Sequence, residues 1–310
     1  MFDERRARLG GPAQWPPARM RELLTEEVWT STAMAGSTLT LDDVKTLLAL
    51  GTTGTERPLD DYVAVADYAE AAAYSRSATR SSRHAFLRLD ELVELHARAL
   101  CRTPGARAGT WRTTTAPPFV SGAIAPPAWL VPREMDAFAE RFSAGPGERH
   151  ALPWLADAHA RLMRIHPFIR GNGRTARLVT NLLARRLELP PLSVRSRDTQ
   201  RYVAALQRAE SRDPWPLALL FARTQLESVD SLLATREGTD ALEPLGALAE
   251  GADLAALYKA AQRGRLRILR RAGMIYTTGA WIVEYERSRA HAGRPRSART
   301  ALKPRDARPI

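Results

Sequence analysis

The chain has 310 residues, of which 45% are hydrophobic, a net charge of +12 and a single cysteine, Cys101. This length allows one large domain and a smaller one, and no apolar run approaches the roughly 18 residues of a membrane span. One cysteine excludes an internal disulfide and argues against a cysteine-based metal site. The charged first residues, MFDERRARLGG, lack the apolar stretch of a secretory signal, so we expect a cytoplasmic protein with no membrane segment.

Four helices are expected in the first hundred residues, from the spacing of apolar side chains. Their approximate ranges are 18–29, 41–50, 59–75 and 87–101. The second has Thr40 at its N-cap and Asp43 three residues on, which is the spacing of a capping box. His96 lies on the apolar side of the fourth helix. A packed, hydrogen-bonded histidine is the simplest interpretation, and a catalytic role is the alternative.

Residues 103–132 are expected to be non-helical. They contain two short β-prone runs, Trp111–Thr115 and Phe119–Ile124, bounded by proline pairs. From the residues alone these runs indicate either a small β-hairpin or an ordinary surface loop.

The most informative stretch runs from His166 to Arg177 and reads HPFIRGNGRTAR. Helical spacing precedes it over 152–165 and resumes at Thr175, so we expect a loop that leads into the N-terminus of a helix. The first N–H groups of a helix lack intrahelical acceptors, and the helix dipole adds partial positive charge there. The stretch therefore predicts a binding site for phosphate groups.

The residue types in this stretch fit such a site. Gly171 and Gly173 would let the backbone close on a ligand, and Arg174 and Arg177 share one helical face. His166 is a natural general base because its ordinary pKa lies near neutral pH. The structural alternative is a hinge between two helices, with a packed histidine and two surface arginines.

The motif resembles the signature of the Fic family, HPFx(D/E)GNGRxxR, and agrees with it at eight of nine defined positions. Fic proteins are mostly helical enzymes that usually transfer AMP from ATP to a hydroxyl group of a target protein. The resemblance implies that His166 deprotonates this hydroxyl and that Phe168 anchors the loop in the core. The nucleotide positions that it implies are Gly171, Asn172 and Gly173 for the α-phosphate, and Arg174 and Arg177 for the outer phosphates.

The chain departs from the family at the position of the acidic residue that binds Mg²⁺, where it has Arg170. A guanidinium is always protonated and has no acceptor, so it cannot ligate a hard cation. ATP is therefore the expected ligand, and a role for Mg²⁺ is doubtful. Arg170 could instead neutralise part of the triphosphate charge directly.

Two other segments extend the resemblance. The β-prone runs match the position of the β-hairpin flap on which Fic enzymes dock the target by strand addition. Ser31–Gly36 resembles the family's inhibitory element, (S/T)xxxE(G/N), whose glutamate pairs with the second arginine of the motif, but Ala35 replaces the glutamate. Glu56 fits the same spacing up to its last residue; the Gly and TLT sequence after Ala35 favours the first alignment. With both acids replaced, we expect the motif's arginines to converge without an internal counter-charge.

Two helices follow the motif's own helix. One starts near Arg201, and the resemblance makes Tyr202 a candidate to enclose the nucleotide base, although it could equally be a core residue. The other, from Trp215 to about Arg236, ends the first domain.

The positive charge is concentrated at the C-terminal end. Residues 259–310 contain 14 Lys and Arg against three acidic residues, a net charge of +11. Such asymmetry indicates an acidic partner, with nucleic acid first and an anionic membrane surface second.

This end also has a recognisable pattern: a helix over 253–263 that ends at Gly264, a hairpin over 266–278 and a final helix over 279–289. The pattern resembles a small winged helix-turn-helix of the excisionase-like kind. The helix before Gly264 would then lie in the major groove, and the DNA contacts implied are Arg263, Arg265, Arg267, Arg270 and Arg271. A packing appendage with a solvated charged face is the alternative.

The sequence thus predicts an all-α fold: a Fic helical domain with a β-hairpin flap (1–235), a small winged helix-turn-helix (236–290) and a basic disordered tail (291–310). The first functional hypothesis is AMP transfer from ATP to a protein Ser, Thr or Tyr hydroxyl, with His166 as the base. The second is a catalytically weak nucleotide- or phosphate-sensing regulator. The expected partners are a nucleotide, a hydroxyl-bearing protein target and duplex DNA, and no membrane.

Overall fold

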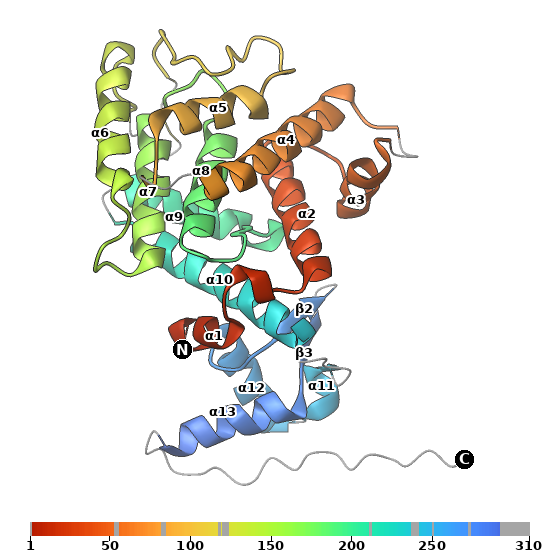
Figure 1. Cartoon of the computed structure of the whole chain (residues 1–310). Helices are drawn as coiled ribbons and strands as arrows, with labels where there is room; N and C mark the ends of the chain where they lie inside the picture. Colours follow the sequence, from red (N-terminus) through yellow and green to blue (C-terminus); the bar gives the residue numbers. More distant parts are fainter. Residues whose placement is uncertain are drawn as a thin grey trace. The chain divides into compact units, whose positions relative to one another are not determined.

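The computed structural model describes residues 2–52, 56–81, 85–116, 119, 124–210, 213–236, 242–249, 251–271 and 274–291. The chain forms two compact units (Figure 1). We call residues 21–225 the central unit, and residues 1–20 together with 226–310 the terminal unit. The division predicted at residue 235 stays a prediction about which parts are independent domains.

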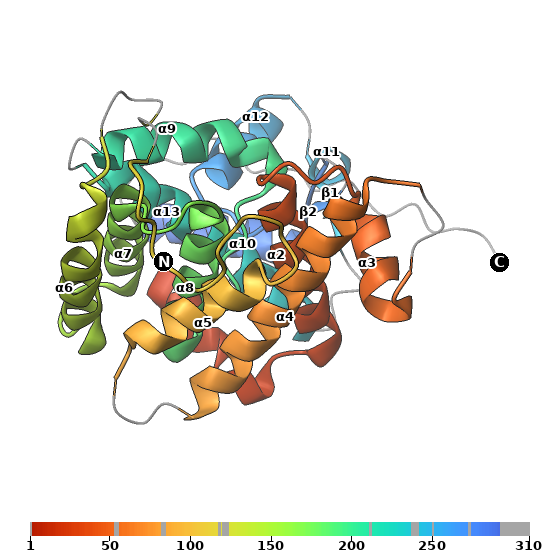
Figure 2. The same ribbon diagram turned by 90° about the horizontal axis from the view of Figure 1, so that it is seen from above.

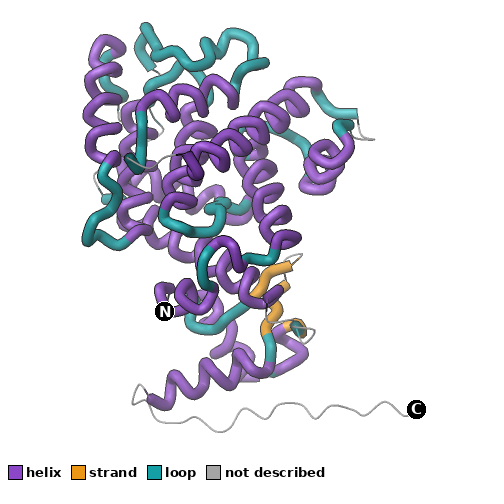
Figure 3. The backbone as a smooth tube through the Cα atoms, viewed as in Figure 1, coloured by secondary structure: helices purple, strands orange, loops and turns teal. Residues whose placement is uncertain are grey.

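The central unit is built from helices, and its described residues contain no strand (Figure 3). Its helices are α3 (Leu41–Leu50), α4 (Leu59–Ser81), α5 (Leu89–Ala99), α6 (Val131–Ser143), α7 (Ala151–Ile165), α8 (Asn172–Arg186) and α9 (Thr199–Glu210). Two longer helices belong to this unit in part: α2 (Pro17–Ala33) with most of its length, and α10 (Trp215–Arg236) with half of its length. The helices expected from the sequence are all present, whereas α6 was not predicted.

Helix α8 is the centre of this unit, and it packs against α4, α5 and α7 (Figures 1 and 2). Every side chain from Thr175 to Ala184 is buried. A helix surrounded on all sides needs apolar or small residues around its whole circumference, which is what LVTNLLA supplies. The loop before α8 is therefore attached to the most enclosed element of the fold.

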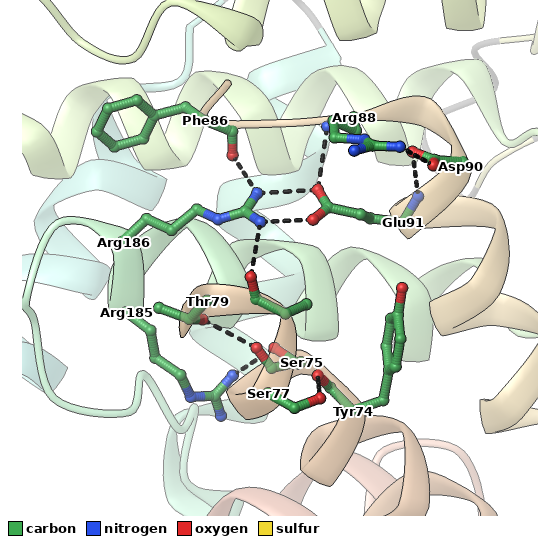
Figure 4. Close-up of polar contacts among 11 residues, drawn as sticks. Tyr74, Ser75, Ser77, Thr79, Phe86, Arg88, Asp90, Glu91, Arg185 and Arg186 are labelled. Atoms are coloured by element: carbon green, nitrogen blue, oxygen red, sulfur yellow. Dashed lines mark hydrogen bonds and ion pairs between the residues drawn. The ribbon is translucent and has the colours of Figure 1, made fainter. Parts of the chain in front are cut away.

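The far end of α8 is held by a buried ion pair (Figure 4). Arg186 contacts both carboxylate oxygens of Glu91, at 2.6 and 3.0 Å, and donates to the backbone oxygen of Phe86 at 2.7 Å. Glu91 also accepts the N–H of Arg88, which precedes the first residue of α5. A two-point arginine–carboxylate contact fixes orientation as well as distance, so it sets the C-terminal end of α8 against the start of α5.

The capping box expected at the start of α3 is confirmed. The Thr40 hydroxyl accepts the N–H of Asp43 at 3.2 Å, and the Asp43 carboxylate accepts the N–H of Thr40 at 2.9 Å. The helix ends at Gly51, whose φ of 74° is one that glycine adopts without strain.

Trp111–Thr115 are non-helical, as expected, and they have no strand pairing among the described residues. Their polar groups are used elsewhere: the backbone N–H of Arg112 donates to the oxygen of Pro167 at 2.9 Å. The second run, Phe119–Ile124, lies outside the described residues except for its two ends. The hairpin flap therefore stays a prediction.

The terminal unit combines short helices with a three-stranded antiparallel sheet. Its elements are α1 (Phe2–Leu9), a part of α10, β1 (Glu243–Pro244), α11 (Leu245–Leu248), α12 (Gly251–Gln262), β2 (Leu269–Arg271), β3 (Met274–Thr277) and α13 (Gly279–His291). The strand order is β1-β3-β2, with Glu243 opposite Thr277 and Arg270 opposite Ile275. Leu245, Leu257, Leu266, Trp281 and Ile282 belong to its core.

The hairpin and the final helix were predicted, whereas α1, β1 and α11 are too short to give a recognisable pattern. Gly264 has a φ of 67°, and the N–H of Arg265 donates to the oxygen of Ala260, so the expected glycine C-cap of α12 is confirmed. The expected tail, 291–310, lies outside the described residues apart from His291. In the part of the chain that the structure describes, no helix combines the length and apolar character needed to cross a bilayer.

Candidate active site

The motif loop begins at His166, which ends α7 in a left-handed conformation, with φ 50° and ψ 58°. Few residues other than glycine adopt this region, so the surrounding contacts must maintain it. Arg112 supplies two of them: its Nε donates to the His166 oxygen at 2.7 Å, and its backbone N–H donates to Pro167. The backbone turn at His166 is thus held by Arg112, which lies in the segment between α5 and α6.

Arg112 was not recognised in the sequence. It is only 2% exposed, and its other side-chain hydrogen bonds go to the oxygens of Thr114, Pro126 and Ile165. Burial of a guanidinium costs free energy unless its donors are satisfied, and here carbonyls satisfy them. No local pattern distinguishes such an arginine from a solvated one.

The imidazole of His166 is arranged to accept a proton. Its Nδ1 lies 3.3 Å from the Met163 backbone oxygen, which can only accept, so Nδ1 carries the hydrogen and Nε2 keeps its lone pair. Burial lowers the pKa of His166; the Met163 carbonyl acts in the opposite direction, and Arg112 lowers it further. Phe119 meets the ring edge to face, with centroids 5.3 Å apart. A neutral imidazole with a free Nε2 is the form that a general base requires.

Phe168 anchors the loop in the core, as expected. It is completely buried, stacks on the ring of His96 at 3.5 Å between centroids, and meets Trp111 at 4.9 Å. Asn172 closes the loop, because its side-chain oxygen accepts the Phe168 N–H at 3.0 Å and its side-chain nitrogen donates to the Phe168 oxygen at 2.8 Å. Both polar atoms of the Asn172 side chain are therefore engaged within the loop, and its backbone N–H is available for an anion.

The two glycines are also constrained by packing inside the protein. Gly171 has a φ of 77°, and a Cβ there would lie 2.4 Å from a methyl carbon of Leu100. A Cβ on Gly173 would lie 3.2 Å from a terminal nitrogen of Arg177, which would have to shift by a few tenths of an ångström. The constraint at Gly171 is therefore the stricter of the two.

Helix α8 begins at Asn172, three residues before the predicted start. Among the described residues, no acceptor takes the backbone N–H groups of Gly171, Asn172 and Gly173. These are the unpaired donors of a helix N-terminus, in the position from which they can bind an anion.

Arg174 adds the positive charge of a guanidinium to this end of α8. It is half-buried, its Nε is buried without a hydrogen-bond partner among the described residues, and one terminal nitrogen makes a 3.4 Å contact with the Ala99 oxygen. Burial lowers the pKa of Arg174, and the neighbouring Arg177 lowers it further, whereas Asp67 raises it. The expected absence of any counter-charge is therefore wrong in part, because Asp67 provides one.

Arg177 is engaged with the N-terminal segment. Its Nε donates to the Ser31 hydroxyl at 2.7 Å and a terminal nitrogen donates to the Ser31 backbone oxygen at 2.8 Å, and the residue is 9% exposed. In this arrangement two of its five N–H donors are used by α2. Ser31 is the first residue of the segment that resembles the family's inhibitory element, with Ala35 at the position aligned with its glutamate.

The remaining predicted nucleotide residues are placed differently. Arg170 has an exposed side chain without a bonded partner among the described residues, and its carbonyl accepts from His96. Tyr202 is 4% exposed, and its hydroxyl lies 2.7 Å from Nε2 of the buried His159. These are the contacts of a packed residue, so Tyr202 offers no open ring face to a base here.

The motif loop offers no carboxylate to a Mg²⁺ ion. Arg170 stands at the acidic position of the motif, and the described residues contain no group of three His, Cys, Asp or Glu side chains close enough to share a metal. Mg²⁺ is usually held by one or two carboxylates together with substrate phosphates, and Arg170 cannot be such a ligand.

The arginines proposed to contact DNA do not share one environment. Arg263 and Arg265 are exposed, and they line a hollow of about 750 Å³ in the terminal unit. Arg267 is 4% exposed and lies over the Trp281 ring, 4.3 Å from its centroid. Arg270 is 3.6 Å from Glu227. The side chain of Arg271 lies outside what the structure describes. Arg267 and Arg270 are thus structural contacts, which corrects their assignment to DNA.

Comparisons with known proteins agree with this geometry. Residues 86–184 match the Fic/DOC family. A protein adenylyltransferase Fic from Nematostella vectensis is 30% identical over 255 residues, which cover 77% of this chain and 59% of the relative. The protein adenylyltransferase fic-1 of Caenorhabditis elegans is 28% identical over 217 residues, covering 68% and 41%. The chain thus spans between about two-fifths and three-fifths of the length of these curated relatives.

Solved structures show the same fold. Fic-1 from C. elegans superposes with a TM-score of 0.68 at 22% identity, covering 77% of this chain and 72% of that one. A Fic family protein from Desulfovibrio desulfuricans G20 has a TM-score of 0.61 at 21% identity, and the match covers 89% of this chain and 93% of that one. A helical fold with this loop at the start of its central helix defines a Fic/DOC domain. The chain contains such a domain.

Proposed function

We propose that the chain is a Fic-type nucleotidyltransferase that moves AMP from ATP to a Ser, Thr or Tyr hydroxyl of a protein. The observations that carry this proposal are the available Nε2 of His166 and, in the same loop, the N–H groups of Gly171, Asn172 and Gly173, which have no acceptor among the described residues. A base and an anion site at adjacent positions are the two parts that phosphoryl-group transfer needs.

The chemistry follows from these positions. Nε2 of His166 takes the proton of the target hydroxyl while the hydroxyl oxygen attacks the α-phosphorus. The bond from the α-phosphorus to the oxygen that bridges to the β-phosphate breaks, and pyrophosphate leaves. The N–H groups at the start of α8 and the guanidinium of Arg174 stabilise the negative charge on the phosphates.

We further propose that no divalent metal is needed to bind the nucleotide. This rests on the donor set: Arg170 cannot ligate a cation, and Arg174 has a buried Nε without a partner among the described residues. Arginines then supply the positive charge that a metal ion supplies elsewhere. This proposal excludes Mg²⁺ from the motif loop only.

The experiment uses the full chain and ATP labelled on its α-phosphate. The chain is incubated with a protein extract, in EDTA and in Mg²⁺, and covalently labelled proteins are counted by electrophoresis. We expect label with both additives, on hydroxyl side chains, and none with His166→Ala. Retention of label in His166→Ala would remove this residue from the mechanism.

A second candidate function is that of a catalytically weak, nucleotide-sensing regulator. The pair of hydrogen bonds from Arg177 to Ser31 favours it, because an arginine that spends two donors on α2 has fewer left for an outer phosphate. ATP binding without any covalent label in the same experiment would support this candidate over the first.

For the terminal unit we propose a winged helix-turn-helix that binds duplex DNA. Its elements after α10 follow the order strand, short helix, helix and hairpin, with β1 beside β3 (Figure 3), which supports this assignment. The phosphate contacts would come from the basic lining of the hollow described above, not from Arg267 and Arg270. Apart from Arg267, that lining has six basic side chains, Arg5, Arg8, Lys259, Arg263, Arg265 and Arg289, against Glu4 and Glu284.

A further inference from the structure

His96 is buried in α5, and both of its ring nitrogens are bonded. Its Nδ1 is the acceptor for the N–H of Gly109 at 2.8 Å, and its Nε2 lies 3.0 Å from the backbone oxygen of Arg170. An N–H can only donate, so Nδ1 is the unprotonated nitrogen. Nε2 therefore carries the hydrogen and donates it to Arg170. Burial lowers the pKa of His96 to about 4, which is consistent with this neutral form at pH 7.

The bonded carbonyl belongs to the peptide between Arg170 and Gly171. In a trans peptide the C=O and the N–H point in opposite directions, and none of the described peptides is cis. A carbonyl held toward the buried His96 therefore directs the N–H of Gly171 away from α5. That N–H is one of the unpaired donors at the start of α8.

The next peptide, between Gly171 and Asn172, is fixed in a similar way. The oxygen of Gly171 accepts the N–H of Thr175 at 2.9 Å and its hydroxyl at 3.0 Å, which sets the direction of the N–H of Asn172. Two consecutive N–H groups are thus oriented through the carbonyls of their own peptides. The carbonyl of Arg170 is held by a side chain from another helix, His96 of α5, whereas the carbonyl of Gly171 is held by Thr175 of α8 itself.

We propose that His96 is a positioning residue for the anion site: by holding the carbonyl of Arg170, it keeps the N–H of Gly171 directed at the phosphate of the bound nucleotide. The inference rests on the proposed nucleotide binding. It gives a specific role to a residue for which packing was the simplest interpretation of the sequence.

Packing is the competing role, because His96 also stacks on Phe168 with the two planes 2° apart. Two amide substitutions separate the roles. The side-chain nitrogen of glutamine reaches the place of Nε2 and can donate to Arg170, whereas asparagine reaches only the place of Nδ1 and serves Gly109. His96→Gln and His96→Asn both replace the aromatic ring that stacks on Phe168.

The test is calorimetric titration of ATP into the full-length wild type, His96→Gln and His96→Asn, in EDTA. Loss of one hydrogen bond to a charged group corresponds to about 10- to 100-fold in affinity, so we expect ATP to bind His96→Asn more weakly by this factor. His96→Gln should retain most of the wild-type affinity. Equal affinities of the two variants would overturn the proposal while leaving nucleotide binding intact.

A measurement on the wild type makes the test independent of whether the variants fold. The amide resonance of Gly171 should move, and its hydrogen exchange should slow, when ATP is added, whereas the amide of Gly147 in a surface turn should not change. An unchanged Gly171 amide in ATP-saturated protein overturns the role of His96 alone. Failure of the wild type to bind ATP overturns the proposed function together with it.

Discussion

The guanidinium of Arg177 bonds both oxygens of Ser31, from Nε to the hydroxyl at 2.7 Å and from a terminal nitrogen to the carbonyl at 2.8 Å. Ser31 lies in the last turn of α2, where helix carbonyls lack intrahelical donors, so the arginine also satisfies this helix end. Both acceptors are neutral, because Ala35 replaces the carboxylate found in the family's inhibitory element. A doubly charged phosphate can compete with neutral acceptors more easily than with a carboxylate.

Replacement of Ser31 by alanine tests whether this contact restrains Arg177. The substitution removes the hydroxyl and leaves the carbonyl. A hydrogen bond to a charged group contributes about 1.5–3 kcal/mol, so we expect a loss of unfolding free energy of up to this amount and a tighter complex with ATP. The measurements are denaturant unfolding and calorimetric titration.

Ser31→Thr keeps the hydroxyl and serves as the matched control, with affinity near that of the wild type. If ATP binds Ser31→Ala more weakly, then Ser31 orients Arg177 toward the phosphates, and the contact is part of the binding site.

The second prediction concerns the base and its pH dependence. His166→Ala should reduce transfer by about 10²–10⁴-fold, the usual contribution of a general base, with nearly unchanged ATP affinity. Because burial lowers the pKa of His166, the imidazole stays unprotonated to lower pH than a free histidine. The acid limb of the transfer rate should therefore have its midpoint below about pH 6.5.

Rates of α-phosphate labelling between pH 4.5 and 8 measure this midpoint, with ATP affinity followed at each pH as the control. A midpoint above 6.5 would mean that a neighbouring anion raises the pKa of the base, contrary to the contacts of its ring.

Local signals explain which features the sequence predicted. The capping box of Thr40 and Asp43, the turn at Gly264 and the loop before α8 all depend on residues close to one another in the chain. The contact of Arg177 with Ser31 joins positions 146 residues apart. The family resemblance brings these two segments together, but no local pattern specifies Ser31 itself as the partner. The burial of Arg112 likewise depends on the carbonyls of a distant loop.

The run Trp111–Thr115 depends on its surroundings in the same way. Threonine, tryptophan and arginine in this run are compatible with a strand, but β-propensity is decided by the surroundings. Among the described residues, the surroundings are the carbonyls at the end of α7, which take donors of Arg112. The run is non-helical, as its residues indicated, and its pairing in a hairpin stays a prediction.

The third prediction concerns the metal. Arg170→Asp places a carboxylate where the family has its acidic residue, next to the anion site. We expect the variant to bind ATP weakly in EDTA, because a negative charge replaces a positive one, and to recover affinity with Mg²⁺. The wild type should bind ATP equally well in both.

Arg170→Gln removes the charge without adding a ligand, so it should stay independent of Mg²⁺. If the wild type itself requires Mg²⁺, then another part of the chain supplies the metal ligands and the exposed Arg170 plays no part in neutralising the phosphates.

A double variant extends this prediction. Adding Ala35→Glu to Arg170→Asp should suppress nucleotide binding, since a carboxylate near Ser31 could pair with Arg177.

The last prediction separates the available cations of the terminal unit from the structural ones. Lys259, Arg263 and Arg265 are exposed and have no carboxylate within ion-pair distance among the described residues. Each phosphate contact contributes about 0.9 to the slope of log K against log salt, because a contact releases condensed counterions. In the full chain, alanine at all three positions should weaken duplex binding and reduce this slope by up to about 2.7.

The control is Arg133→Ala, at an exposed site of the central unit, which should leave affinity and slope unchanged. Fluorescence anisotropy of a labelled duplex between 50 and 200 mM salt gives both quantities. A slope that the triple substitution does not change would assign the DNA contacts to another surface, and an absence of binding by the wild type at low salt would make the terminal unit a packing appendage.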